Sequence, residues 1–315
     1  WLGKIFDSHP DTAYRSEPDN FPHLDEVPPF ADAADSMRYR TAVQAFAQGL
    51  ARVNDYRHAA KPPLFSKSYR SAPGYQFFRA AAFGARLGTR INRNWPVPGA
   101  RVDGVRPPPV MVWKSIRGLG RTAILLDALP GTKFIHLLRH PCGHIASVLR
   151  GERESGFPSR SSEYYGIFKM LCETPQGRRR GLTVEVLRRL TSEERLAWQW
   201  VLVNEKALEE GAGRAHAVRY EDLCADPPAV ARTLFTFAGL EWHAQTQAFI
   251  QASTSGGNQR YFSVFKNPAR SANRWRHELD SVRIDRILAV VAESPALAPL
   301  YDIAAAPMRL AGESS

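Results

Sequence analysis

The sequence is poor in cysteine and has no long apolar run. Its three cysteines, Cys142, Cys172 and Cys224, are too few and too widely spaced for a disulfide framework or a zinc site. We therefore expect a reducing, cytoplasmic compartment and no metal. No stretch approaches the roughly 18 consecutive apolar residues of a membrane span, so we expect no stable membrane insertion. The chain begins at Trp1 rather than Met, which leaves an upstream anchor or signal open.

Acidic residues are outnumbered in this chain. Its 315 residues include 42 Lys and Arg against 31 Asp and Glu, which gives a formal net charge of +11. This excess indicates an anionic partner and leaves nucleic acid, a membrane surface and phosphate or sulfate ligands open. Aromatic and basic residues do not interleave as they do in stacking platforms, so we expect no nucleic-acid partner. A basic nucleic-acid-binding module is the non-enzymatic alternative, and the oligomeric state is open.

Apolar runs of strand length alternate with helical patterns, which predicts an α/β fold with a parallel sheet. We expect residues 1–303 to form a single domain, residues 151–190 to be irregular and residues 304–315 to be a loose tail. The predicted strands cover residues 12–15, 110–114, 133–138 and 215–219. One predicted helix ends near residue 9, and another begins near residue 141. The other predicted helices cover residues 36–59, 75–92, 119–128, 193–211, 227–252 (as a pair) and 271–293.

The stretch KFIHLLRHPCGHIASVLR, residues 133–150, carries the clearest chemical signal. Its strand delivers Arg139 at the carboxyl end, where open α/β sheets bind their ligands. A helix follows at once, so free backbone N–H groups lie beside Arg139, and Ser147 comes two turns along that helix. A guanidinium and a hydroxyl suit a phosphate monoester. An arginine paired with a carboxylate and a packed serine fit the same spacing equally well.

The segment RHPCGHIAS resembles the 3′-phosphate-binding segment of sulfotransferases that use 3′-phosphoadenosine-5′-phosphosulfate (PAPS). In that family an Arg and a Ser eight residues later hold the 3′-phosphate of the donor, and Arg139 and Ser147 fall on those positions. His140 replaces the family's usual Asp. The resemblance implies PAPS as sulfuryl donor, with the desulfated nucleotide (PAP) as product and no metal.

Three further segments resemble the same family in the same order. WLGKIFDSHPD resembles the helix after the phosphosulfate loop, VRYEDL resembles a strand at the nucleotide site, and FKNPARSANRW resembles the segment that folds over the nucleotide. The resemblance implies nucleotide contacts from Trp1, Tyr220, Lys266 and Arg274, with Arg270 as a further candidate in the last segment. A Trp1 in core packing and a packed Tyr220 on a buried strand are the simpler interpretations. The implied fold is a P-loop NTPase-like, three-layer fold with a parallel central sheet flanked by helices.

The family's phosphosulfate-binding loop does not occur in this sequence. Such a loop follows a strand, and its backbone amides cradle the 5′-phosphosulfate. By resemblance it would end immediately before Trp1. We therefore expect the chain to begin within the motif, to lack the first strand of the central sheet and to bind PAPS poorly.

The resemblance also implies catalytic residues. Glu17 follows the strand at 12–15, where carbohydrate and tyrosylprotein sulfotransferases carry a catalytic Glu, and is expected to act as general base. Lys114, at the end of strand 110–114, is expected to stabilise charge on the transferring group, and Arg117 to bind donor or acceptor. The expected reaction is in-line transfer of a sulfuryl group from PAPS to a hydroxyl or amine of a small molecule or glycan.

Two other interpretations stay open. A P-loop kinase or phosphotransferase would share the sheet and the anion chemistry, but the sequence contains no Gly-x-x-x-x-Gly-Lys-Ser/Thr segment. An inactive, sulfotransferase-like binding protein would follow from the missing loop alone. The sequence does not identify the acceptor.

Overall fold

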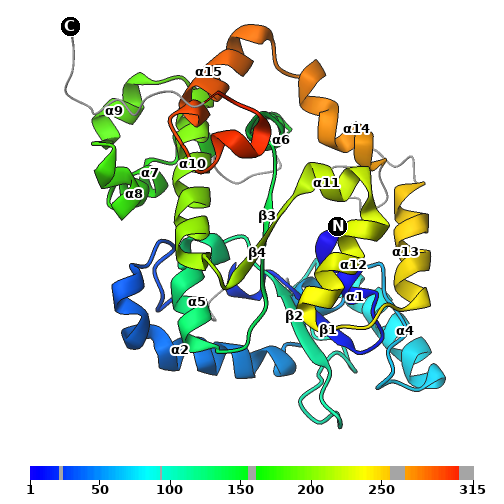
Figure 1. Ribbon diagram of the computed structural model, residues 1–315. Helices are drawn as coiled ribbons and strands as arrows, with labels where there is room; N and C mark the ends of the chain where they lie inside the picture. The colour runs from blue at the N-terminus through cyan, green and yellow to red at the C-terminus, as the bar shows by residue number, and fades with distance from the viewer. Residues whose placement is uncertain (21–23, 93, 155–160, 256–266, 305–315) are drawn as a thin grey trace, which may run out of the picture.

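The computed structural model describes residues 1–20, 24–92, 94–154, 161–255 and 267–304. Four strands form two parallel pairs (Figure 1), which confirms the predicted α/β class with parallel strands. Strand β1 (Thr12–Ser16) pairs with β2 (Val110–Lys114) from Thr12 opposite Val110 to Ser16 opposite Lys114. Strand β3 (Phe134–Leu138) pairs with β4 (Ala215–Arg219) over their full lengths.

Helices cover both faces of these strands. On one face, Met111 and Trp113 of β2 and Phe134 of β3 pack against α2 (Ser36–Gly49) and α5 (Thr122–Ala128). On the other face, Val112 and Ile135 pack against α1 (Leu2–Asp7), α12 (Pro227–Ala238) and α13 (Ala244–Thr254). Alternate residues of a strand point to opposite faces. β2 and β3 therefore lie in one layer between two helical layers, as the three-layer prediction requires.

The predicted single central sheet is divided in two in the part of the chain that the structure describes. β2 and β3 share both cores but are not hydrogen-bonded to each other. Val110 of β2 and Leu137 of β3 are exposed, whereas strands inside a parallel sheet are usually buried on both faces. β2 pairs with β1 along one edge, and β3 pairs with β4 along one edge. No described strand pairs with the other edge of β2 or of β3, and the sheet is divided there.

Most predicted helices are present, and the remaining bounds follow. The helix predicted over 36–59 is interrupted by an extended segment, because Asp55 accepts a hydrogen bond from the backbone of His58 and starts a new helix there. The other helices are α3 (Tyr56–Ala59), α4 (Ala72–Gly88), α6 (Pro141–Arg153), α10 (Ser192–Gly211), α11 (Tyr220–Ala225), α14 (Pro268–Asn273) and α15 (Ser281–Ala292).

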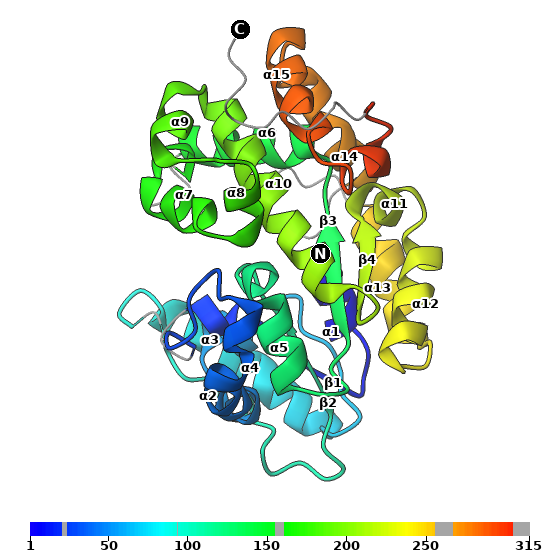
Figure 2. The same ribbon diagram turned by 60° about the vertical axis from the view of Figure 1, so that its left-hand side comes forward.

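The prediction of an irregular segment at 151–190 was wrong. This segment contains α7 (Tyr165–Cys172), α8 (Pro175–Arg179) and α9 (Val184–Arg189), which lie beside α10 (Figure 2). Thr174 and Thr183 cap α8 and α9 through their side-chain oxygens. Phe168, Leu171 and Leu187 are fully buried against α10. Caps and a few buried apolar residues stabilise these short helices, which show little sequence periodicity.

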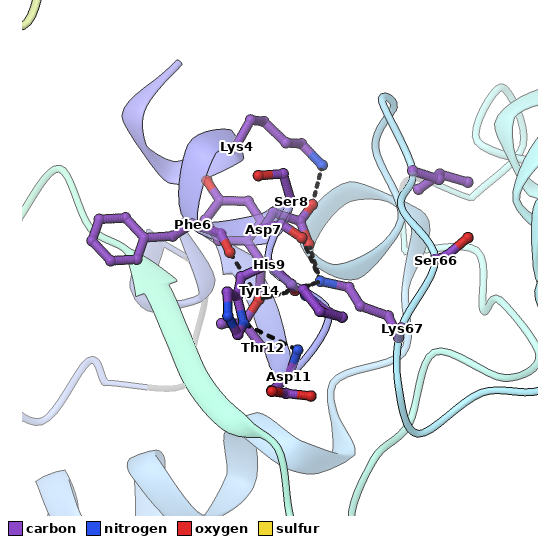
Figure 3. A network of polar contacts seen from close by, with 12 residues as sticks. Lys4, Phe6, Asp7, Ser8, His9, Asp11, Thr12, Tyr14, Ser66 and Lys67 are labelled. Atoms are coloured by element: carbon purple, nitrogen blue, oxygen red, sulfur yellow. Dashed lines mark hydrogen bonds and ion pairs between the residues drawn. The ribbon is translucent and has the colours of Figure 1, made fainter. Parts of the chain in front are cut away.

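A buried polar network fixes the turn between α1 and β1 (Figure 3). The ammonium of Lys67 donates to the backbone carbonyls of Asp7 and His9 and to the hydroxyl of Thr12. Burial lowers the pKa of Lys67. Burial also raises the pKa of Asp7, but Lys4 and Lys67 more than offset this, so its net pKa is lowered. The network attaches the loop that carries Lys67 to the start of β1.

None of the helices in the described ranges is both long and apolar enough to cross a bilayer.

Candidate functional site

Arg139 lies between the end of β3 and the start of α6, as the sequence predicts. Pro141 occupies the first turn of α6, where its missing N–H costs nothing. The backbone carbonyl of Arg139 accepts a hydrogen bond from the indole of Trp200 on α10, at 3.1 Å. Its guanidinium lies over the ring of Tyr220, 5.1 Å from the centroid. β3, α6, α10 and α11 together fix the position of this side chain.

Within the described part of the chain, no carboxylate pairs with the guanidinium of Arg139. Its Nη2 donates to the backbone carbonyl of Ser271 at 3.2 Å, and its buried Nε has no partner among the described residues. A Cβ added to Gly143 would lie only 3.3 Å from that Nε. The side chain of Arg139 therefore lies beside the first turn of α6. Buried donors normally find acceptors, so an unsatisfied guanidinium beside a helix N-terminus is suited to an anion.

The C-terminal segment covers this end of the sheet. α14 packs against α11, and the short helix Arg274–His277 that follows packs against α6. Trp275 stacks on His140, with ring centroids 4.6 Å apart, and contacts Gly143. The predicted segment at 265–275 is thus brought over Arg139 in its described part, from residue 267. Lys266 lies outside the described residues, and the exposed Arg270 makes no side-chain contact that bears on the site.

A chain of hydrogen bonds through Arg150 and Glu278 connects Ser147 to Arg274. Arg150 donates to the hydroxyl of Ser147 at 3.4 Å and to the carboxylate of Glu278 at 2.6 Å. Glu278 also accepts a 2.6 Å hydrogen bond from Nε of Arg274. Arg274 is therefore already paired, and half of its side chain is exposed. Arg150 and Glu278 were not assigned roles from the sequence, although Arg150 is one turn beyond Ser147.

Tyr220 begins helix α11 and does not lie on a strand, which corrects the interpretation of the VRYEDL segment. The strand β4 ends at Arg219, and Glu221 and Asp222 supply the acidic first turn of α11. Burial raises the pKa of Tyr220, and its position over Arg139 depends on this helix start. Glu221 accepts a 3.1 Å hydrogen bond from the backbone N–H of His140, and burial raises its pKa.

Glu17 and Lys114 meet at the ends of β1 and β2. The ammonium of Lys114 forms an ion pair with the carboxylate of Glu17, and the backbone N–H of Glu17 donates to the carbonyl of Lys114 at 2.7 Å. Burial raises the pKa of Glu17. The positive charges of Lys114, Lys61 and Arg57 lower it by more than burial raises it, so the net pKa is lowered. Glu17 therefore carries a negative charge at neutral pH, in a cluster of positive charges.

The backbone of Glu17 is strained. Its φ of 55° lies in the left-handed region, which only one other described non-glycine residue, Asp302, adopts. Such a conformation costs on the order of 1–3 kcal/mol and is concentrated at functional sites.

Sequence reasoning missed a buried network beside Glu17. The hydroxyl of Ser115 donates to the carboxylate of Asp19 at 2.5 Å and accepts from the backbone N–H of Gly118 at 2.7 Å. The buried Arg121 lies 4.0 Å from the same carboxylate and donates to the carbonyls of Val27 and Pro28. The network joins the loops that follow β1 and β2. Ser115 stands three residues before Gly118, a spacing typical of a turn, and this spacing could have indicated the network from the sequence.

The remaining predicted residues are Trp1 and Arg117. Trp1 packs partly buried against the α12–α13 core, and its indole donates to the hydroxyl of Ser253 at 3.0 Å. This contact agrees with core packing, and adenine stacking stays a prediction. Arg117 is exposed at the start of the turn Gly118–Arg121, which packs against α10 as α6 does. Among the residues with described positions, no group of three His, Cys, Asp or Glu converges on a metal-sized site.

The geometry is thus an unpaired arginine at the end of β3 and a glutamate–lysine pair at the ends of β1 and β2. Residues 1–244 match the model of a family described as the sulfotransferase family. This chain belongs to the sulfotransferase family. The assignment agrees with the family resemblance of the segments around Trp1, Arg139 and Tyr220.

Curated sulfotransferases share local similarity with this chain. Carbohydrate sulfotransferase 6 of Homo sapiens is 38% identical over 80 residues, which cover 24% of this chain and 20% of that protein. Carbohydrate sulfotransferase 5 of Mus musculus is 39% identical over 79 residues, again 24% and 20% of the two chains. The chain thus spans only about a fifth of the length of these sulfotransferases.

Two solved sulfotransferase domains also align with the chain. The domain from the curacin biosynthetic pathway has 14% identity and a TM-score of 0.34, and the match covers 82% of this chain and 93% of that domain. The domain from the Synechococcus PCC 7002 olefin synthase has 16% identity and a TM-score of 0.41, over 91% of this chain and 88% of that domain.

Proposed function

We propose that this chain transfers a sulfuryl group from PAPS to a hydroxyl or amine of an acceptor. The observation that carries the proposal is the guanidinium of Arg139, whose buried Nε has neither a hydrogen-bond partner nor a paired carboxylate among the residues that the structure describes. A phosphate monoester would supply the missing acceptors, and the N-terminus of α6 would add its backbone N–H groups. The 3′-phosphate distinguishes PAPS from common adenine nucleotides, so this clamp selects the donor.

The remaining clamps follow from the same cluster. The hydroxyl of Ser147 would contact the phosphate, with Arg150 held beside it by Glu278. Tyr220 packs on the guanidinium of Arg139 and fixes its plane. Arg274 would turn from Glu278 to the nucleotide, a change that its exposed side chain allows. Lys266 stays a predicted nucleotide contact.

For the chemical step, we propose Glu17 as the general base and Lys114 as the cation on the transferring group. The bond between sulfur and the phosphate oxygen breaks as the acceptor oxygen or nitrogen bonds to sulfur, and the acceptor proton passes to Glu17. The transition state of such transfers is loose, by analogy with phosphoryl transfer, so positioning and charge supply most of the catalysis. Lys114 keeps Glu17 ionised before the acceptor binds.

A glycan is the acceptor class that we favour. The curated relatives are named as carbohydrate sulfotransferases. A cavity of about 640 Å³ is lined by Asp25, Glu26, Asn54 and Asn94 together with an apolar wall. Carboxylates and amides suit sugar hydroxyls. The cavity borders α3, which also carries Arg57, one of the cations that act on Glu17.

Competition between nucleotides separates this proposal from a phosphotransferase. PAP should displace labelled PAPS from the protein, whereas ATP and 5′-AMP should compete at least tenfold less well because they lack the 3′-phosphate. Stronger competition by ATP would favour the phosphotransferase. Selective PAP binding without transfer to any of a panel of glycans, tyrosine peptides and amines would favour the inactive binding protein.

A further inference from the structure

Helix α4 presents apolar side chains on two opposite faces. Its inner face, with Phe78, Ala82 and Ala85, is buried in a small core. The outer face and the residues just after the helix are exposed instead. The exposed fractions are 61% for Phe77, 67% for Phe83, 54% for Leu87 and 86% for Ile91. At 3.6 residues per turn, the three helical residues span an arc of about 120° opposite the buried face. Isolated exposed apolar residues are ordinary, but this group forms one surface.

The same part of the chain is strongly basic. Residues 56–102 contain nine Lys or Arg and no Asp or Glu. Arg79 and Arg86 lie along one border of the apolar arc, and Arg90 follows the helix. In the described ranges, no carboxylate forms an ion pair with any of these three arginines. Arg79 contacts the ring of Tyr75 and the side chain of Gln76. The apolar surface is therefore bordered by unneutralised positive charge.

We propose that the outer face of α4 docks on the surface of an anionic lipid bilayer. Phe77, Phe83 and Leu87 would enter the boundary between head groups and acyl chains, and the arginines would reach the phosphates. A basic amphipathic helix lying in the interface has this composition. Figure 1 places α4 at the rim of the molecule, far from α6, so docking would leave the Arg139 cluster uncovered.

Charge and side-chain chemistry argue against two other occupants. A symmetric contact with a second copy would bring two basic surfaces together, and like charges repel. A nucleic acid would use aromatic rings as stacking platforms. Leu87 and Ile91 offer no such ring, whereas acyl chains accept any apolar side chain.

Vesicle flotation tests the proposal directly. The protein is mixed with vesicles of phosphatidylcholine alone or of phosphatidylcholine rich in phosphatidylserine. We expect binding to the anionic vesicles only, and release by high salt, because surface charges are screened within about 8–10 Å at ionic strengths of about 0.1–0.15 M. Arg86→Gln should weaken binding about fivefold, and adding Arg79→Gln should weaken it about fivefold again.

Substitutions in the apolar arc provide the second arm. The double variant Phe83→Glu, Leu87→Glu should abolish flotation. Met37→Glu is a matched control on α2, because Met37 is 67% exposed and lies outside the arc. It should float like the unaltered protein. Thermal unfolding should be unchanged in all variants, since every substituted side chain is exposed.

Several results would overturn the proposal. They include no flotation at low salt, equal flotation with neutral vesicles, and flotation that the variants in α4 leave unchanged. A dimer in sedimentation velocity that Leu87→Glu dissociates, in a protein that does not float, would assign the face to a second copy. A salt-dependent gel shift lost in the arginine variants, again without flotation, would assign it to nucleic acid.

Discussion

Replacing Arg139 with alanine should weaken PAP binding without unfolding the protein. With the described residues, the guanidinium makes one hydrogen bond, to the backbone carbonyl of Ser271, and no ion pair. Its loss therefore leaves no carboxylate buried without a partner, and the free energy of unfolding should change little. A hydrogen bond to a charged group contributes about 1.5–3 kcal/mol. At about 1.4 kcal/mol per factor of ten, Arg139→Ala should raise the Kd for PAP by roughly 10- to 150-fold.

Calorimetric titration with two nucleotides isolates the 3′-phosphate. The loss should appear with PAP and largely disappear with 5′-AMP, which lacks that phosphate. Arg219→Ala is the matched control, because Arg219 ends the neighbouring strand but is already paired with Asp222 at 2.6 Å. It should change PAP affinity less than twofold. Equal losses for PAP and 5′-AMP, or none for either, would refute the assignment of Arg139 to the 3′-phosphate.

Other predictions concern the catalytic pair and the segments that support it. Glu17→Gln should abolish most turnover while leaving the Kd for PAP within about twofold; turnover like that of the unaltered protein would remove Glu17 as base. Since the pKa of Glu17 is lowered from 4.5, the rate of sulfuryl transfer should be constant near neutrality and fall only below about pH 4.5. Lys114→Met should move that fall to higher pH, because Lys114 lowers the pKa of Glu17. A fall at the same pH in this variant would contradict the coupling between Lys114 and Glu17. Ser115→Ala should lower kcat more than it raises KM for PAPS, because the bond to Asp19 orients the loops that carry the pair; a change in KM alone would contradict this role. Lys67→Met should lower the free energy of unfolding in denaturant titration by roughly 1–3 kcal/mol, since the buried carbonyls of Asp7 and His9 lose their donor while Asp7 keeps its ion pair with Lys4. A loss below about 0.5 kcal/mol would show that the network contributes little.

The sequence predicts the frame around Arg139 well. The run KFIHLL is mostly apolar, and Pro141, which suits a first helical turn, follows it after Arg139 and His140, so strand, arginine and helix follow from local chemistry. Glu17 and Lys114 also come together as expected, because both follow strands that pair in parallel register. The roles of these residues stay proposals.

Other features depend on contacts that local sequence does not encode. Ser115 and Asp19 are 96 residues apart, so their hydrogen bond exists only in the fold. The helix start at Tyr220 was mistaken for a strand, although Glu221 and Asp222 supplied the acidic signal of a first turn. The positive φ of Glu17 follows from the loop that Asp19 and Arg121 hold together, not from any preference of glutamate.

The division of the sheet bears on the predicted phosphosulfate loop. β2 and β3 each have one edge that no described strand pairs, and both contribute to the same two cores. A further parallel strand between β2 and β3 would complete one central sheet, which is where the family resemblance expects the strand before the phosphosulfate loop.

Transfer of labelled sulfur tests the central claim most directly. The protein is incubated with ³⁵S-labelled PAPS and a panel of glycans, and the labelled glycan is quantified alongside the release of PAP. The account predicts label on at least one glycan, in equal amount to the PAP released, and loss of both in the Glu17→Gln and Arg139→Ala variants. Label transfer that both variants retain in full, or the absence of transfer to any glycan from protein that binds PAP, would contradict it.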